Sequence, residues 1–236
     1  MNGMNGTVSD HPGMRYRERF FSMVMSDAPG SVLDVGCGDG AFLRRARERG
    51  CAVAGLETDA DRVAALAQDG IPAQQGRAEA LPFGDGSFDA IVLEYVAHHC
   101  ADLARALAEA VRVARRGVYV LDAWYDEAIA SQRTALAFDL WSKSIDRRLG
   151  MVHNACPTAV ELMAPLAGRG DVAIDYTQML ILQDMALDTL RAAGTEQLAR
   201  VANDAASAAA LDSILDEARR AGASEDGALI MAIRKR

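Results

Sequence analysis

The chain has 236 residues, of which 50% are hydrophobic and 25% are charged. This length supplies one well-buried core and is short for two domains, so a single domain over residues 1–236 is predicted. The formal net charge of −8 disfavours nucleic acid and anionic membranes as partners, because phosphate binding depends on clustered Lys and Arg side chains.

The first residues and the cysteines show no sign of secretion or of metal binding. Residues 1–13 are rich in Gly, Asn and Ser and are predicted to form a mobile tail. No stretch reaches the about 20 apolar residues of a membrane span. The cysteines lack the CxxC spacing of a metal site; they are Cys37, Cys51, Cys100 and Cys156. A soluble, cytoplasmic protein with reduced thiols and no metal is therefore expected.

The first regular element is predicted at residues 14–27, where apolar and aromatic side chains recur at helical spacing. From residue 31 onward, short apolar runs alternate with polar turns and helical patterns. The predicted strands are residues 31–35, 52–56, 71–75, 88–93 and 117–122. The predicted helices between them are residues 40–49, 59–69 and 101–114. This alternation is typical of an α/β fold with a parallel sheet, helices on both faces and a ligand outside the carboxyl ends of the strands.

Beyond Asp122 the pattern changes to longer helical stretches. Helices are expected in residues 123–149, 157–167 and 185–221, and strands in residues 171–182 and 227–236. The last of these helical stretches is Ala-rich and contains Gly194, which predicts a break there with Thr195 as the cap of the next helix.

A glycine loop follows the first predicted strand and opens a helix. The segment Ser31–Gly50 reads SVLDVGCGDGAFLRRARERG. Its glycines allow backbone to approach a ligand without a Cβ in the way. The spacing fits GxGxxA, so a nicotinamide or flavin dinucleotide stays an alternative on this loop alone.

Two acidic residues bear on that alternative. Asp34 lies two residues before the first glycine, where a carboxylate disfavours a pyrophosphate and suits an ammonium or sulfonium. Glu57 ends the second strand, where an acid can accept hydrogen bonds from ribose hydroxyls. Together they predict a nucleoside that carries positive charge.

Four segments resemble the class I S-adenosylmethionine-dependent methyltransferases, in particular the small single-domain group with the ubiquinone-biosynthesis and malonyl-carrier methyltransferases. They are VLDVGCGDG, VAGLETD, GRAEALPFGDGSFDAIVLEYVAHH and ALAEAVRVARRGVYVLD, within about residues 31–122. The resemblance implies a Rossmann-like sheet of seven strands, the last antiparallel. It also implies S-adenosylmethionine as the cofactor.

The resemblance assigns residues to the cofactor. The expected cofactor-binding residues are Asp34, Gly36, Gly38, Glu57, Ala78, Glu79 and Glu94. The first three surround the methionine part, Glu57 binds the ribose hydroxyls, and Ala78 and Glu79 lie beside the adenine. Arg77 stands where the family usually has an acid, so adenine must be held there by backbone or by another side chain.

A base is needed only if the methyl acceptor carries a proton at the working pH. His98 or His99 is the predicted general base, since imidazole titrates near neutral pH. The alternative is that the paired histidines only shape the pocket. The expected acceptor-binding residues are Tyr16, Arg19, Trp124, Trp141 and His153. The alternatives are that Trp124 and Trp141, like Phe20, only pack helices onto the sheet and that His153 is an exposed loop residue.

Residues 123–167 and 185–221 are interpreted as a helical cover on the acceptor side, with a core or dimer-contact role as the alternative for the second stretch. The sequence thus predicts an enzyme that methylates a small molecule at O or N, either as a monomer or as a homodimer. Two alternatives stay open. One is a non-catalytic sensor or scaffold of the same fold, and the other is an NAD-dependent oxidoreductase.

Overall fold

The computed structural model describes residues 11–201 and 204–236. The first ten residues of the predicted tail lie outside this part. The strands are β1 (Ser31–Val35), β2 (Ala52–Glu57), β3 (Ala73–Gln75), β4 (Phe88–Glu94), β5 (Ala114–Trp124), β6 (Val172–Met179) and β7 (Gly227–Lys235). The helices are α1 (Pro12–Ser26), α2 (Ala41–Glu48), α3 (Ala60–Gln68), η1 (Ala97–His99), α4 (Leu103–Val113), α5 (Ala130–Arg148), α6 (Ala159–Met163), η2 (Ala164–Leu166), α7 (Leu187–Ala199) and α8 (Ala205–Ala221).

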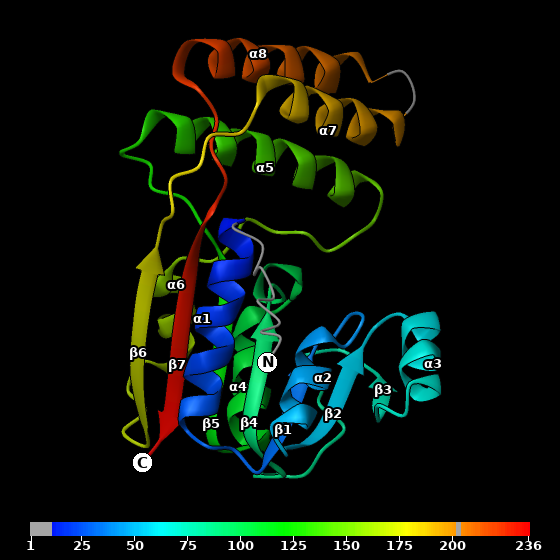
Figure 1. Ribbon diagram of the computed structural model, residues 1–236, viewed down its shortest axis with the longest axis vertical. Helices are drawn as coiled ribbons and strands as arrows, with labels where there is room; N and C mark the ends of the chain where they lie inside the picture. Colours follow the sequence, from blue (N-terminus) through cyan, green and yellow to red (C-terminus); the bar gives the residue numbers. More distant parts are fainter. Residues whose placement is uncertain (1–10, 202–203) are drawn as a thin grey trace, which may run out of the picture.

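The strands form one sheet in the order β3-β2-β1-β4-β5-β7-β6 (Figure 1). β1 to β5 pair in parallel, and β7 runs antiparallel to both of its neighbours, β5 and β6. The Rossmann-like sheet of seven strands with the last one antiparallel is therefore confirmed. The order reverses between β1 and β4, and this is the point where open α/β sheets bind their ligands.

Alternate residues of the strands build two separate cores, as the period of two in a strand requires. In β1, Leu33 and Val35 face a core that contains side chains of α4 and α6. Val32 faces the opposite core, which is built with α1 and α2. The sheet is thus covered by helices on both faces (Figure 1).

Helix α1 begins at Pro12, two residues before the predicted start. Proline suits the first turn of a helix because the N–H that it lacks has no partner there. The ring of His11 accepts a hydrogen bond from the N–H of Gly13 at 3.2 Å and caps this end. Pro12 and Gly13 therefore belong to a helix and not to the predicted tail.

The region after Asp122 departs from the predicted boundaries. β5 begins three residues before the prediction and runs on to Trp124, so the following helix, α5, begins only at Ala130. α5, α7 and α8 lie together beyond one end of the sheet (Figure 1) and share an apolar cluster that includes Trp141, Leu190 and Leu211.

The predicted helix break at Gly194 is wrong. Gly194 lies inside α7, and the two helices separate between Ala199 and Ala205. A Cβ at Gly194 would lie 2.5 Å from Cδ1 of Leu211, so the glycine allows α8 to pack closely against α7. Thr195 continues the helix and donates its hydroxyl hydrogen bond to the Arg191 carbonyl at 2.9 Å.

Within the described residues, no helix has the length and apolar character needed to cross a membrane.

Candidate active site

The glycine loop leaves β1 and enters α2 with three residues in the left-handed region. The φ angles are +71° at Gly36, +54° at Gly38 and +80° at Gly40. A Cβ at Gly36 would lie 2.6 Å from Cγ2 of Val96. The loop is also tied to the next strand, because the N–H groups of Gly36 and Cys37 both donate to the Leu56 carbonyl. Its sharp turn therefore requires glycine at these positions.

Glu57 ends β2 and is held by the backbone around it. Its Oε2 accepts a hydrogen bond from Gly38 at 2.9 Å, and its Oε1 accepts from Thr58 at 2.7 Å and from Asp59 at 3.1 Å. Burial opposes ionisation, but the hydrogen bonds outweigh it and lower the pKa of this carboxyl below its usual value. An ionised carboxylate, fixed in direction and with Oε2 carrying a single hydrogen bond, suits a pair of sugar hydroxyls.

Asp34 and Glu94 place two more carboxyls at the same edge of the sheet. Asp34 is 3% exposed, and its pKa is raised well above the usual value by burial and by the charges of Glu94 and Glu57. Burial also raises the pKa of Glu94, against the opposing charge of Arg17, with which Glu94 forms an ion pair. Burial favours the protonated forms of Asp34 and Glu94, and a cation bound nearby would favour their ionised forms, so this edge suits a cationic ligand better than a pyrophosphate.

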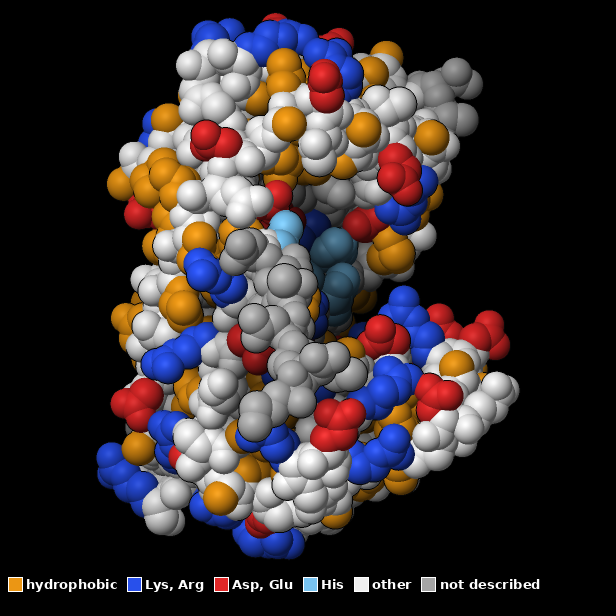
Figure 2. All heavy atoms as spheres, viewed as in Figure 1, with side chains coloured by type: hydrophobic (Ala, Val, Ile, Leu, Met, Phe, Trp, Pro, Cys, Tyr) orange, Lys and Arg blue, Asp and Glu red, His pale blue; other side chains and the backbone are white. Residues whose placement is uncertain are grey.

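A cavity of about 620 Å³ runs along the carboxyl ends of the parallel strands. Of the residues expected to bind the cofactor, four line it, namely Gly36, Glu57, Ala78 and Glu79. Among the described residues, Asp34, Gly38 and Glu94 are not part of its lining. Its other walls come from Tyr95, Val96, His99 and Cys100 after β4 and from Gly150, Met151 and Val152 after α5. In the space-filling view a hollow separates the two halves of the molecule, and histidine side chains lie within it (Figure 2).

The expected adenine side contains an ion pair. Nε of Arg77 lies 3.5 Å from Oε2 of Glu79, and both residues line the cavity. Glu79 also accepts a hydrogen bond from the N–H of Ala101 at 2.7 Å, which ties this wall to the turn before α4. Glu79 therefore balances the charge of Arg77. It also supplies a carboxylate two residues after the position where related sequences usually have an acid.

His98 is buried and is held by Asp122. Its Nδ1 lies 2.6 Å from Oδ1 of Asp122, which is fully buried in β5, and its backbone N–H donates to the same carboxylate at 3.2 Å. Nδ1–H donates to this oxygen, so Nε2 keeps its lone pair. The pair has the arrangement of a general base with the carboxylate that orients it.

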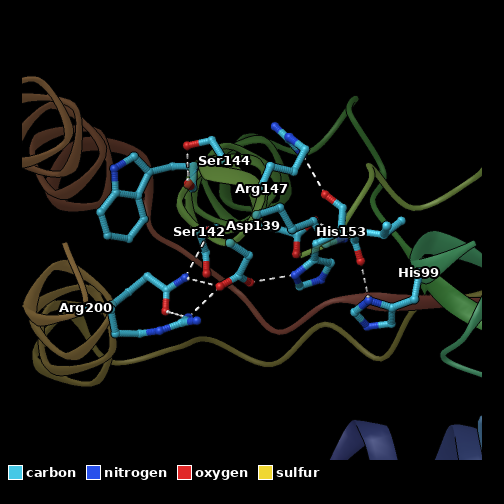
Figure 3. A network of polar contacts seen from close by, with 12 residues as sticks. His99, Asp139, Ser142, Ser144, Arg147, His153 and Arg200 are labelled. Atoms are coloured by element: carbon cyan, nitrogen blue, oxygen red, sulfur yellow. Dashed lines mark hydrogen bonds and ion pairs between the residues drawn. The ribbon is translucent and has the colours of Figure 1, made fainter. Parts of the chain in front are cut away.

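His99 and His153 complete a group of three imidazoles. His99 Nδ1 donates to the Val152 carbonyl at 3.0 Å, and His153 Nδ1 donates to Oδ2 of Asp146 at 2.6 Å (Figure 3). Burial lowers the pKa of both His99 and His153, which keeps these rings neutral. His99 thus lines the cavity, with His98 and His153 packed against it.

Comparison with known proteins bears on what this cavity is for. Residues 33–121 match the family described as a methyltransferase domain. The chain is 32% identical over 123 residues to a demethylmenaquinone methyltransferase of Thermus thermophilus, covering 48% of this chain and 56% of that one. This stretch is a methyltransferase domain. The expected family, the class I S-adenosylmethionine-dependent methyltransferases, is thereby confirmed for it.

A second curated relative and a solved structure show how much of the chain is similar to known proteins. The chain is 39% identical over 92 residues to a malonyl-[acyl-carrier protein] O-methyltransferase of Erwinia billingiae, covering 38% of this chain and 37% of that one. The chain therefore spans about half or less of the length of these curated relatives. The structure of YcgJ from Bacillus subtilis has the same fold, with a TM-score of 0.63 and 21% identity, over 93% of this chain and 99% of that one.

Three of the residues expected to bind the acceptor pack into apolar cores. Tyr16 is fully buried, and its hydroxyl accepts a hydrogen bond from Ile181 N–H at 2.7 Å. Trp141 is 7% exposed beneath α7 and α8 and donates from its indole to the Ser207 carbonyl at 3.0 Å. Trp124 packs against the core and against Gly227. The side chains of Trp124 and Trp141 thus pack between elements, as the packing alternative has it, and that of Tyr16 does the same.

Arg19 is exposed on α1 and is not among the described residues that line the cavity. His153 was expected as an acceptor residue or as an exposed loop residue. The structure places it half-buried beside His99, with Nδ1 held by Asp146, and it is not among the described residues that line the cavity.

Two residues that contact the expected site residues were not identified from the sequence, namely Arg17 and Asp122. Arg17 pairs with Glu94, and its guanidinium lies 4.9 Å from the centre of the Tyr95 ring. Tyr95 itself has a φ of +56°, a conformation that costs energy outside glycine and that is found at functional sites. Asp122 could have been found, because an acid ends or nearly ends each of the strands β1, β2, β4 and β5.

Proposed function

We propose that this protein transfers the methyl group of S-adenosylmethionine to a small-molecule acceptor at oxygen or nitrogen. The observation that carries the proposal is the cavity at the carboxyl ends of the strands, which Glu57 lines on one side and His99 on another. The residues fit the cofactor in three respects: a glycine turn without room for a Cβ, a fixed carboxylate for the ribose, and negative charge for the cation.

The role of each side chain follows from its position. Glu57 accepts from the ribose hydroxyls, while Asp34 and Glu94 supply the negative charge that holds the cationic methionine part. When bound, the cofactor supplies an activated methyl group on a sulfonium, whose S–C bond breaks with its electron pair going to sulfur. The chain aligns the acceptor with this group, and such alignment can lower a barrier by about 7–11 kcal/mol.

The imidazole group supplies the candidates for taking the acceptor proton. Nε2 of His98 can accept the proton that the acceptor loses as its bond to the methyl carbon forms, and the Asp122 carboxylate then stabilises the imidazolium. His99 lines the cavity and is the second candidate for this task. A homodimer and a cytoplasmic location stay predictions of the sequence.

Calorimetric titration with S-adenosylhomocysteine, the demethylated product, tests the cofactor site. Wild type is expected to bind it, Glu57→Gln to bind it at least about tenfold more weakly, and Glu48→Gln, an exposed residue of α2, to bind it like wild type. A wild-type protein that does not bind the compound would contradict the proposal.

Incubation with methyl-labelled cofactor and a metabolite extract tests the chemistry and identifies the acceptor. Label is expected in a small molecule, and a His98→Asn variant is expected to transfer less of it. Binding without transfer would favour the sensor or scaffold alternative, while binding of NAD in place of the nucleoside would favour the oxidoreductase.

A further inference from the structure

We propose that His98, His99 and His153 bind one divalent transition-metal ion, such as Zn²⁺ or Co²⁺, beside the cavity. One nitrogen of each ring lies within 4.8 Å of the others. The ring centres are 4.2 Å apart for His98 and His99, 4.4 Å for His99 and His153, and 5.2 Å for His98 and His153. Three imidazoles with an open fourth position are a common ligand set of catalytic zinc sites.

The hydrogen bonds of the rings leave the same nitrogen free on all three. Nδ1 of each ring donates to an oxygen, which belongs to Asp122 for His98, to the Val152 carbonyl for His99 and to Asp146 for His153. The two carboxylate contacts are 2.6 Å long. This assignment gives each ring a lone pair on Nε2, which is the pattern that metal-binding histidines show.

The groups that hold the rings are anchored in turn. Asp146 in α5 also accepts hydrogen bonds from Gln197 in α7 and from Arg200, which directly follows that helix. Figure 3 shows this chain of contacts running from Arg200 to His153. Asp122 accepts a further hydrogen bond from the N–H of Ala123 at 2.8 Å. The three rings are therefore positioned by two separate parts of the fold, the sheet and the helical layer.

A second set of donors overlaps this one and is less suited to an ion. Asp122, Cys156 and His98 also lie within 4.8 Å of one another through one atom each. However, Asp122 already accepts from His98, and Nζ of Lys143 lies 2.9 Å from Sγ of Cys156. Lys143 is balanced by Asp139 at 2.8 Å and stays beside the thiol. Three imidazoles match the ligand set of catalytic zinc sites more closely than this mixed set does, so they are favoured.

A bound ion would also narrow the acceptor class, and this step rests on the proposed function. His99 lines the cavity, so the open coordination position faces the space where the acceptor binds. A metal lowers the pKa of an oxygen bound to it, so a hydroxyl there would lose its proton to solvent before the C–O bond forms. An amine nitrogen bound to the ion would have no lone pair left for attack. We therefore infer an alcohol or phenol acceptor. With an ion bound the histidines act as ligands, so the role of His98 as the base belongs to the metal-free protein.

Metal titration of the chelator-treated protein tests the site without any methyl acceptor. Calorimetry with Zn²⁺ is expected to give one site per chain, and Co²⁺ is expected to give the visible absorption bands of a low-symmetry nitrogen site. His153→Ala and the exposed His99→Ala should each bind at least about tenfold more weakly. His11→Ala removes the only other histidine of the sequence and should bind like wild type.

Asp146→Asn keeps every ligand and removes only the charge that orients His153, so a loss of about 10- to 100-fold in affinity is expected. Wild type that binds no Zn²⁺, or a triple histidine-to-alanine variant that is folded by circular dichroism and binds as wild type does, would overturn the inference. Titration of the same samples with S-adenosylhomocysteine separates the two proposals. Binding of that compound without Zn²⁺ binding removes the metal site alone, and the reverse result removes the proposed function alone.

Discussion

Nδ1 of His98 lies 2.6 Å from Oδ1 of Asp122, in a buried pair that joins the ends of two neighbouring parallel strands. Asp122→Asn keeps the shape of the side chain but removes its charge. We expect kcat with the identified acceptor to fall by about 100-fold, within the usual range for a positioned proton transfer. Steady-state kinetics check this. An unchanged affinity for S-adenosylhomocysteine is the control, and an unchanged kcat would contradict the role.

Asp34→Asn should make the folded protein more stable and weaken the binding of S-adenosylmethionine. Burial and the nearby carboxylates raise the pKa of Asp34, so its ionised form destabilises the folded protein at neutral pH. The stability that the protonated group provides is lost as the pH rises, and asparagine retains it. We expect the melting temperature at pH 7 to rise by about 2–4 °C, which corresponds to about 1 kcal/mol in a chain of this size.

The same variant should bind S-adenosylmethionine at least about tenfold more weakly, because the charge that faces the cation is gone. Thermal unfolding and calorimetry measure the two effects. Asp212→Asn, at an exposed position of α8, is the matched control and should change neither. A lower melting temperature for Asp34→Asn would show that the carboxylate stabilises the fold.

Much of this architecture could be predicted from the sequence because its signals are local. Each strand of the parallel part is a short apolar run, and the glycine turn and the acids at the strand ends stand in fixed order along the chain. The cofactor side of the cavity, with Gly36, Glu57, Ala78 and Glu79, follows from that order.

The rest depends on contacts between distant residues. His153 meets His99 only because the loop after α5 returns to the end of β4, and no local pattern contains that return. Gly194 resembles a helix break in sequence, yet its role is set by Leu211 on another helix. From the sequence Trp141 was expected to bind the acceptor, because nothing near it in the chain shows that α7 and α8 bury it.

Gly36→Ala should be more harmful than Gly50→Ala. Both glycines have positive φ, +71° and +86°, so both substitutions strain the backbone. Only at Gly36 would the new Cβ meet a neighbour, Val96, whereas nothing lies within 4 Å at Gly50. We expect Gly36→Ala to be less stable by a further amount of about 1–3 kcal/mol, measured by urea unfolding.

Adding Val96→Ala to Gly36→Ala should recover part of that difference, because it removes the methyl groups that the Cβ would meet. Equal stability of Gly36→Ala and Gly50→Ala would show that strain alone, and not the close approach of Val96, makes glycine necessary.

Asp226 should make the stability depend on pH. Burial raises its pKa to about 6, with the charges of Glu225 and Asp139 adding to the effect. The folded protein therefore loses stability as the pH rises from about 4 to about 6 and this group ionises. Asp226→Asn should be more stable than wild type at pH 7 and no more stable at pH 4. Urea midpoints at the two pH values check this, and an equal difference at both would contradict it.

The position of β7 has a consequence for synthesis. This strand pairs with β5 on one side and β6 on the other, yet it follows both in the chain. While the ribosome is still translating, β5 and β6 present unpaired strand edges, which readily pair with other chains. The nascent polypeptide can finish its sheet only when residues 227–235 have left the exit tunnel, so a stalled or truncated product would be prone to aggregate.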